Sequence, residues 1–327
     1  MSRMGSKDLK YLGVEFRGVG HYLPERVIYN DEIKSRLKYP EMHPAEKAVI
    51  GNIGVTERHR VNETETVPYM AMKAAQDALA DAKMKPEEID LFILANWTDR
   101  YYLPDLAPQA SKLTGTKNAL AFDISTACTG FVHGVQMAAC YLQSGRWKNA
   151  LVVGSERFSV RTRMGGYGEF TAGDAAAGVV LSANPQTDTG LIDSFLVDVA
   201  DLADIIVTGP PPQSYVKSYP ELVTNAADLT LKAFDLLMEK YGLTEKDVDW
   251  VIPHPGTDVV VQDVLNRIKF PRERVLGNFD RVGNASAASI PIVISEYYKK
   301  GIIKKGQLLL TPAVGGGFYW GGLLFRF

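Results

Sequence analysis

The pattern of apolar and polar positions occurs twice along this chain. Residues 70–82 (MAMKAAQDALADA) and 228–242 (DLTLKAFDLLMEKYG) each read as an amphipathic helix, and an acidic turn follows each of them. Short apolar runs come next, LFILA at 91–95 and WVIP at 250–253, and such runs are typical of buried strands. Three pairs of residues recur at one constant offset: Asp90 with Asp249, Thr98 with Thr257, and Asp99 with Asp258. The shared order of helix, turn and strand predicts two related α/β units.

A second pair of segments extends the repeat. AFDISTACTGF and NFDRVGNASAAS each contain a Phe-Asp pair and then enter a stretch of small residues that ends near Gly145 or Gly301. A strand is predicted after each stretch, ALVVG in one half and LLLTP in the other. The small residues predict two helices packed closely in the interior, one from each half. If these helices meet at a pseudo-twofold axis, Cys128 and Asn284 come together despite their distance in sequence.

The alternation of strands and helices predicts an α/β protein with mixed sheets covered by helices. Between the repeats lie the turn-rich segment NPQTDTG and the segment TGPPPQSY, whose prolines exclude regular structure. We therefore predict an N-terminal half over residues 1–185 and a C-terminal half over residues 186–327.

Composition narrows the classes of function. The net charge is −2 without a long run of one sign, which argues against nucleic acid as the main partner. No apolar run approaches the roughly 20 residues of a membrane span, and the charged N-terminus lacks the apolar core of a signal peptide. The two cysteines and five histidines show neither a disulfide framework nor zinc-ligand spacing. We expect a cytoplasmic protein with no bound metal or cofactor.

Cys128 is the first candidate for chemistry. It follows the predicted strand NALAFDI and begins the predicted helix CTGFVHGVQMAACYLQSG. At a helix N-terminus, backbone N–H groups and the helix dipole favour the thiolate and lower the pKa of a cysteine. The alternative is a small buried core cysteine, which is how we interpret Cys140 in the body of the helix. The threonine and glycine after Cys128 favour the functional interpretation.

Three further features have two interpretations each. His254 follows WVIP between two prolines, where a catalytic histidine and a structural one fit equally well. Asn284, taken alone, is explained as a turn residue or a helix cap. The run TPAVGGGFYWGG predicts either a tight turn or a backbone N–H that approaches a reacting carbonyl. No lysine-serine pair follows it, so it is not interpreted as a phosphate loop.

Taken together, the segments resemble the β-ketoacyl-acyl-carrier-protein synthase III family of thiolase-like condensing enzymes. The matching motifs cover nearly the whole chain in the family's order: GVGHYLPERVIYNDEI, GVTERHR, FDISTACTGFVHG, FTAGDAAAG, PHPG, GNASAASIP and GGGFYWGGLLFRF. The resemblance implies a duplicated α/β fold in five layers, αβαβα, with two mixed sheets and buried helices. It also implies a homodimer.

The same resemblance implies a Cys-His-Asn triad of Cys128, His254 and Asn284. Cys128 would carry an acyl group as a thioester, and its N–H would form an oxyanion hole with that of Gly316. His254 and Asn284 would hydrogen-bond the second substrate's thioester oxygen as it becomes an enolate, which favours Claisen chemistry over transfer to an alcohol or amine. The residues expected to bind substrate are Tyr101, Tyr102 and Leu103, in an acyl pocket shared with the other subunit, and Thr257 and Val314.

Some residues depart from the family's pattern. Ala48, Asn52 and Gly166 stand where the family's housekeeping members bind coenzyme A with a tryptophan and two arginines, and arginine is hard to replace for phosphate. Thr257 and Val259 replace an asparagine and an arginine that contact pantetheine and carrier protein. The departures predict a specialised enzyme of polyketide or other secondary metabolism, loaded chiefly from acyl carrier protein.

A basic cluster is a candidate docking surface for an acidic carrier protein, although a solvated surface is the favoured explanation for any single member. Its members are Arg267, Lys269, Arg272 and Arg274. Three alternatives remain beside this hypothesis. They are fatty-acid initiation from an acyl-coenzyme A and malonyl-carrier protein, an acyltransferase that forms esters or amides, and a non-catalytic partner subunit.

Overall fold

The structure is a computed structural model, and it describes residues 9–37, 47, 50–51, 53–101, 103–209, 215–219 and 221–327. Its described helices include none long and apolar enough to cross a membrane.

The first half of the chain builds a five-stranded sheet. Its strands lie in the order β1 (Val14–Tyr22), β7 (Asp174–Ala183), β6 (Asn149–Arg157), β4 (Leu91–Ala95) and β5 (Leu120–Ile124). The first two pairings, β1 with β7 and β7 with β6, are antiparallel, and β4 runs parallel to both of its neighbours. The run LFILA is therefore an interior strand with a parallel neighbour on each side, and it is buried throughout, as its apolar side chains predicted.

The second half repeats this arrangement. Its sheet has the order β8 (Gly190–Asp198), β13 (Tyr319–Arg326), β12 (Leu308–Gly315) and β11 (Trp250–Val251). Again the first two pairings are antiparallel and the third is parallel. A parallel bridge between Val251 and Val275 stands where the first sheet has β5. The matching order and direction of strands confirm the duplication.

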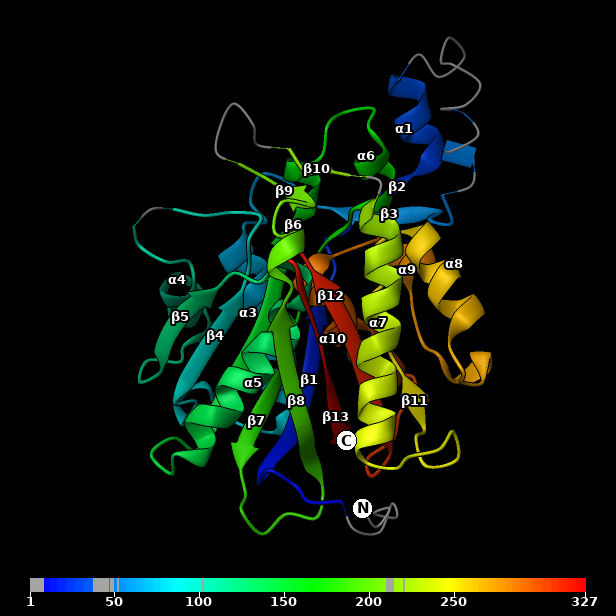
Figure 1. Cartoon of the computed structure of the whole chain (residues 1–327). Coiled ribbons are helices and arrows are strands. Elements are labelled where there is room, and N and C mark those ends of the chain that lie inside the picture. Colours follow the sequence, from blue (N-terminus) through cyan, green and yellow to red (C-terminus); the bar gives the residue numbers. More distant parts are fainter. Residues whose placement is uncertain are drawn as a thin grey trace.

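Helices separate and cover the two sheets. The helices of the outer and central layers are α3 (Val67–Ala82), α4 (Ala107–Thr114), α5 (Gly130–Gln143), α7 (Glu221–Lys240), α8 (Asp258–Arg267) and α10 (Ser289–Lys299). In the order of the layers, α3 packs on the first sheet, α5 and α10 lie between the sheets, and α7 packs on the second. Figure 1 shows α4 towards the left of the molecule and α7 and α8 towards the right. The five-layered αβαβα fold is confirmed.

The central layer depends on small residues. The 3₁₀ turns η4 (Ala127–Thr129) and η8 (Ser286–Ala288) precede α5 and α10, and they pack against each other. A Cβ on Gly130 would lie 2.8 Å from the Cβ of Ala95 and 2.9 Å from the Cβ of Ala287. Because such a contact is too short for any larger residue, the glycine is what allows the two turns to approach.

Shorter elements frame the layers. The other described helices and strands are β2 (Arg26–Tyr29), α1 (Asn30–Arg36), β3 (Glu57–Arg60), α6 (Tyr167–Thr171), β9 (Ile206–Val207), β10 (Lys217–Ser218) and α9 (Phe279–Val282). The remaining 3₁₀ turns are η3 (Pro86–Glu88), η5 (Phe158–Arg161), η6 (Ala200–Leu202) and η7 (Arg272–Arg274). The chain passes from the first sheet to the second between Ala183 and Gly190. The division at 185/186 into two domains stays a prediction. The expectation for Cys140 is wrong, because its position on α5 is exposed.

Candidate active site

A cavity of about 540 Å³ opens where the two halves meet, and Cys128, His254 and Asn284 all line it. Cys128 comes from η4 in the first half, whereas His254 and Asn284 follow β11 and α9 in the second. The predicted meeting of Cys128 and Asn284 is therefore found, since both residues face one space. A volume of this size is typical of sites for small organic ligands.

Cys128 is a neutral thiol in the resting protein. It is partly buried beneath the cavity, and α5 begins two residues later at Gly130. Burial raises the pKa of the thiol to about 12, and hydrogen bonding from Ser286 and Asn284 offsets only part of that effect. The expectation of a lowered pKa is thus wrong, because the loss of hydration outweighs the helix N-terminus. A base is needed to remove the proton when the thiol reacts.

His254 is held through its backbone, and its ring makes no hydrogen bond to the described residues. The backbone N–H donates to the carbonyl of Pro312 at 3.0 Å, and the residue is only 2% exposed. Neither Nδ1 nor Nε2 has a hydrogen-bond partner among the described residues. Burial lowers the pKa of the imidazole to about 3, so the ring is neutral at physiological pH. A structural histidine would have bonded to its loop, and the free ring in the cavity favours the functional interpretation instead.

Asn284 has a fixed orientation. Its Nδ2 donates to the carbonyl of Gly256 at 2.8 Å, and its Oδ1 accepts from the backbone N–H of Ser286 at 2.7 Å. Its backbone N–H donates to the carbonyl of Thr171 at 2.7 Å. The residue is therefore the turn residue that its sequence suggested, and it also lines the cavity. An amide nitrogen has two donors, and the second N–H of Nδ2 is directed to the cavity side, where hydrogen bonding from Asn284 lowers the pKa of Cys128.

The glycine run lies directly against the nucleophile. A Cβ on Gly315 would lie 2.8 Å from the backbone N of Thr129 and 3.0 Å from that of Cys128. Gly316 lines the cavity, and a Cβ there would lie 3.2 Å from Cγ2 of Ile206. The interpretation as a turn is confirmed, because residues 316–318 form a turn after β12. The oxyanion role of the Cys128 and Gly316 N–H groups stays a prediction.

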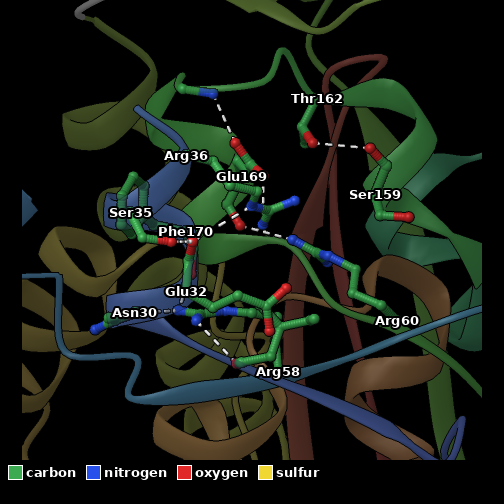
Figure 2. Close-up of polar contacts among 12 residues, drawn as sticks. Asn30, Glu32, Ser35, Arg36, Arg58, Arg60, Ser159, Thr162, Glu169 and Phe170 are labelled. Atoms are coloured by element: carbon green, nitrogen blue, oxygen red, sulfur yellow. Dashed lines mark hydrogen bonds and ion pairs between the residues drawn. The ribbon is translucent and has the colours of Figure 1, made fainter. Parts of the chain in front are cut away.

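Two arginines, one buried and one half-buried, hold one wall of the cavity. Arg58 donates to the carbonyl of Phe170 at 2.6 Å, and Arg60 donates to the carbonyl of Ala172. Figure 2 shows both arginines reaching towards the segment that carries Phe170. Ala172 forms a β-bridge with Asn284. The arginines of the GVTERHR motif therefore hold the segment that positions Asn284.

The residues predicted to bind substrate divide into two groups. Val314 and Thr257 line the cavity, and Thr257 also caps α8 by accepting from Val260. Tyr101 and Leu103 are 58% and 88% exposed and do not line the cavity of the single chain. Tyr102 lies outside the described residues. The substrate role of each of them stays a prediction.

The basic cluster predicted for docking is partly engaged within the chain. Arg267 pairs with Asp228 at 2.6 Å and with Asp263 at 2.9 Å. Arg274 donates to two backbone carbonyls and stacks on the ring of Phe270. The remaining two members, Lys269 and Arg272, are exposed. The docking role of all four stays a prediction.

Of the positions that depart from the family's pattern, Gly166 lines the cavity, and Val259 is exposed on α8. Ala48 and Asn52 lie outside the described residues. Within the described part of the chain, no group of three or more His, Cys, Asp or Glu residues could hold a metal ion.

Several residues near the site were not predicted. Arg161, Arg163 and Lys217 add three cations to the lining, and no carboxylate is among the described lining residues. Glu156 is fully buried near the end of β6, and its charge raises the pKa of Cys128. Glu156 could have been identified in the sequence, because it closely follows the apolar strand ALVVG. Nothing in the sequence indicated that the three cations lie together.

The fold and the site define the class of thiolase-like condensing enzymes. Residues 122–198 match the family described as 3-oxoacyl-[acyl-carrier-protein] synthase III, and residues 238–327 match its C-terminal part. The β-ketoacyl-[acyl-carrier-protein] synthase III of Acidiphilium cryptum is 33% identical over 318 residues, which are 95% of this chain and 98% of that protein. This chain belongs to the β-ketoacyl-acyl-carrier-protein synthase III family, whose members are acyl-transferring enzymes.

Solved structures agree with this assignment. The 3-oxoacyl-[acyl-carrier-protein] synthase III of Aquifex aeolicus superposes with a TM-score of 0.88 at 31% identity, covering 96% of this chain and 100% of that one. The priming β-ketosynthase of the R1128 polyketide pathway superposes with a TM-score of 0.85 at 24% identity, covering 97% of each chain. The second likeness concerns the fold alone.

Proposed function

We propose that this enzyme loads an acyl group onto Cys128 and then forms a carbon–carbon bond with a malonyl or β-ketoacyl thioester held on acyl carrier protein. The observation that carries the proposal is that Cys128, a neutral unpartnered His254 and a fixed Asn284 line one cavity. In the first step the Cys128 sulfur attacks the acyl carbonyl, and the donor's sulfur leaves as a thiol. The N–H groups of Cys128 and Gly316 stabilise the intermediate oxyanion.

In the second step, His254 and Asn284 act on the incoming thioester. A neutral imidazole donates one ring N–H, and Asn284 has a second N–H beside the one bound to Gly256, so together they can supply two donors for an enolate oxygen once Cys128 is acylated. The enolate carbon attacks the acyl carbonyl on Cys128, and the cysteine sulfur is released. Loss of carbon dioxide from a malonyl group generates this enolate without a base. A histidine of pKa about 3 is a weak base, which disfavours transfer to an alcohol or amine.

The charges of the cavity suit a phosphopantetheine thioester. Arg161, Arg163 and Lys217 can meet its phosphate, and no described carboxylate in the lining opposes it. We propose acyl carrier protein as the main donor, in polyketide or other secondary metabolism, because Gly166 stands where a coenzyme A-binding arginine is expected. The named relatives at 31–33% identity favour a second candidate, fatty-acid initiation from an acyl-coenzyme A.

We also propose a cytoplasmic homodimer. The support is the strong exposure of Tyr101 and Leu103, which is what residues lent to a partner subunit's pocket show before assembly.

The test is to incubate the protein with acyl-coenzyme A or acyl carrier protein and measure its intact mass. The expected result is one acyl adduct that forms faster from carrier protein, followed by a β-keto product when malonyl-carrier protein is added. Rapid loading from coenzyme A would select fatty-acid initiation. An adduct without a carbon–carbon product would favour an ester- or amide-forming acyltransferase, and no adduct from either donor would favour a non-catalytic subunit.

A further inference from the structure

Two aromatic rings form one side of the cavity, on the part contributed by the first half. Trp97 follows β4, and Phe158 begins η5 directly after β6. The two rings meet edge to face, with their centroids 5.2 Å apart and an interplanar angle of 81°. Phe158 lines the cavity, whereas Trp97 is not among the described lining residues. The cavity wall at Phe158 is therefore backed by a second and larger ring.

Hydrogen bonds fix the segments that carry these rings. The fully buried Glu156 accepts from the backbone N–H groups of Trp97 and Thr98 at 3.3 and 3.2 Å, and from the Thr98 hydroxyl at 2.8 Å. The same hydroxyl accepts from the backbone N–H of Arg157 at 2.9 Å, and the Thr98 carbonyl accepts from Nε of Arg161 at 2.5 Å. These two arginines lie on either side of the phenylalanine in the chain. The two segments are thus joined to each other, which makes this part of the wall rigid.

The indole also reaches the second half, next to the turn of the nucleophile. Its N–H donates to Oγ of Ser286 at 2.8 Å, and the backbone N–H of Ser286 donates to Oδ1 of Asn284 at 2.7 Å. Ser286 begins η8, which packs against η4, the turn that contains Cys128. Both halves of the chain therefore hold the indole close to the turn of the nucleophile.

We propose that Trp97 and Phe158 limit the length of the acyl chain on Cys128, so that the enzyme accepts short acyl groups and excludes long ones. This inference rests on the proposed function. During condensation, the second thioester must reach His254 and Asn284 while the acyl group is still bound to Cys128. Because the incoming thioester then occupies the side of the second half, the acyl chain extends towards the wall of the first half, where Phe158 stops it.

A rigid aromatic wall discriminates by size. A chain longer than the available space would have to displace fixed rings, which is as unfavourable as overpacking a protein core. Replacing the indole by a methyl group would instead leave an apolar void, and such voids stay dry and accept apolar groups. The size of the side chain at position 97 therefore sets how many methylene groups fit.

The variant Trp97→Ala tests this limit. One carrier protein is charged with acetyl, butyryl, octanoyl or dodecanoyl groups, and acylation of Cys128 is followed by the mass of its peptide. The wild-type protein should load the two shorter groups at least about tenfold faster than the two longer ones. In Trp97→Ala, Phe158 can turn into the vacated space, so the ratio of octanoyl to butyryl rates should rise about tenfold or more. Because each ratio is measured within one protein, a smaller folded fraction does not change it.

Three further variants separate the bulk of the indole from its other contacts. Phe158→Ala removes the wall itself and should admit long chains as Trp97→Ala does. Trp97→Phe keeps a ring but loses the N–H that Ser286 accepts, so it should retain most of the preference for short chains. Val223→Phe narrows the opposite wall, on α7, and should slow all four chains by a similar factor.

The outcomes distinguish this inference from the function on which it rests. Equal loading of all four chains by the wild-type protein, or an unchanged profile in Trp97→Ala, would overturn the inference and leave the proposed function in place. It would also be overturned if Trp97→Phe matched Trp97→Ala, or if Val223→Phe lost only the long chains, because the chain would then lie against α7. No adduct with any chain would contradict the proposed function itself.

Discussion

The two short turns at the centre of the molecule, η4 and η8, hold equivalent places in the two halves but carry different chemistry. Each begins at a residue of positive φ, 46° at Ala127 and 51° at Ser286, and each leads into a buried helix. The next residue is Cys128 in the first turn and Ala287 in the second. Duplication thus built two equivalent turns, of which one carries the nucleophile and the other brings supporting polar groups. The two halves therefore share a backbone arrangement, but they contribute different functional groups to the site.

Removing the nucleophile should have the largest effect. Cys128→Ala is expected to lose all acylation, because the second turn has alanine at the equivalent place and no sulfur to replace it. Intact mass after incubation with an acyl donor measures this. Cys140→Ala is the matched control and should keep the adduct, since Cys140 is exposed and outside the cavity. An adduct that persists in Cys128→Ala would place the nucleophile elsewhere.

Substitutions of the second half's site residues should leave the acylation of Cys128 unchanged and slow the carbon–carbon condensation. His254→Ala and Asn284→Ala each remove one donor to the enolate oxygen, and we expect condensation to slow by about 10²–10³-fold. Single-turnover assays that follow acylation and product formation separately measure this. If acylation fell as much as condensation, both residues would serve the cysteine instead of the second substrate, and the division between the turns would be wrong.

The next largest effect is expected from disturbing the contact between the glycine run and η4. Gly315→Ala would place a methyl group 2.8 Å from the backbone N of Thr129, so either the turn or the strand must move. We expect a lower melting temperature and acylation slowed by about tenfold or more, because reacting atoms tolerate little displacement. Gly277→Ala is the matched control, since a Cβ there meets nothing within 4 Å. Equal behaviour of the two variants would show that the close approach is dispensable.

The smallest effect is expected from substituting an arginine that holds the segment beside Asn284. Arg60→Leu leaves the carbonyls of Glu169 and Ala172 without their donor, which we expect to cost about 1–3 kcal/mol of unfolding free energy. Arg26→Leu, which removes an exposed ion pair with Glu32, should change stability by less than about 1 kcal/mol. Denaturant unfolding measures both. Arg60→Leu should also weaken condensation more than loading, because Ala172 bridges to Asn284.

The sequence predicted much of the fold because local patterns were clear. The repeated helix, acidic turn and apolar run identified the halves, and small residues marked the buried helices. Cys140 shows the limit of that reasoning. Its place in an apolar helix suggested the core, yet Cys140 itself is exposed, and which positions of a helix are covered depends on the neighbouring layers.

The site, like the fold, was predicted from the sequence only in part. Motifs and their spacing singled out Cys128, His254, Asn284 and the glycine run, and the structure brings them to one cavity. The sequence did not show that Glu156 and Ser286 affect the thiol, because Glu156 comes from another strand and Ser286 from the other half of the chain.

By itself, the sequence determined the repeated elements, the family and the side chains available for chemistry, since these depend on residue type and short-range spacing. Only the tertiary structure decided their protonation. Burial in the folded chain raises the pKa of Cys128 to about 12, lowers that of His254 to about 3 and raises that of Glu156 to about 7. The physical reason is that a pKa depends on water excluded and charges assembled by segments that meet only in the folded chain.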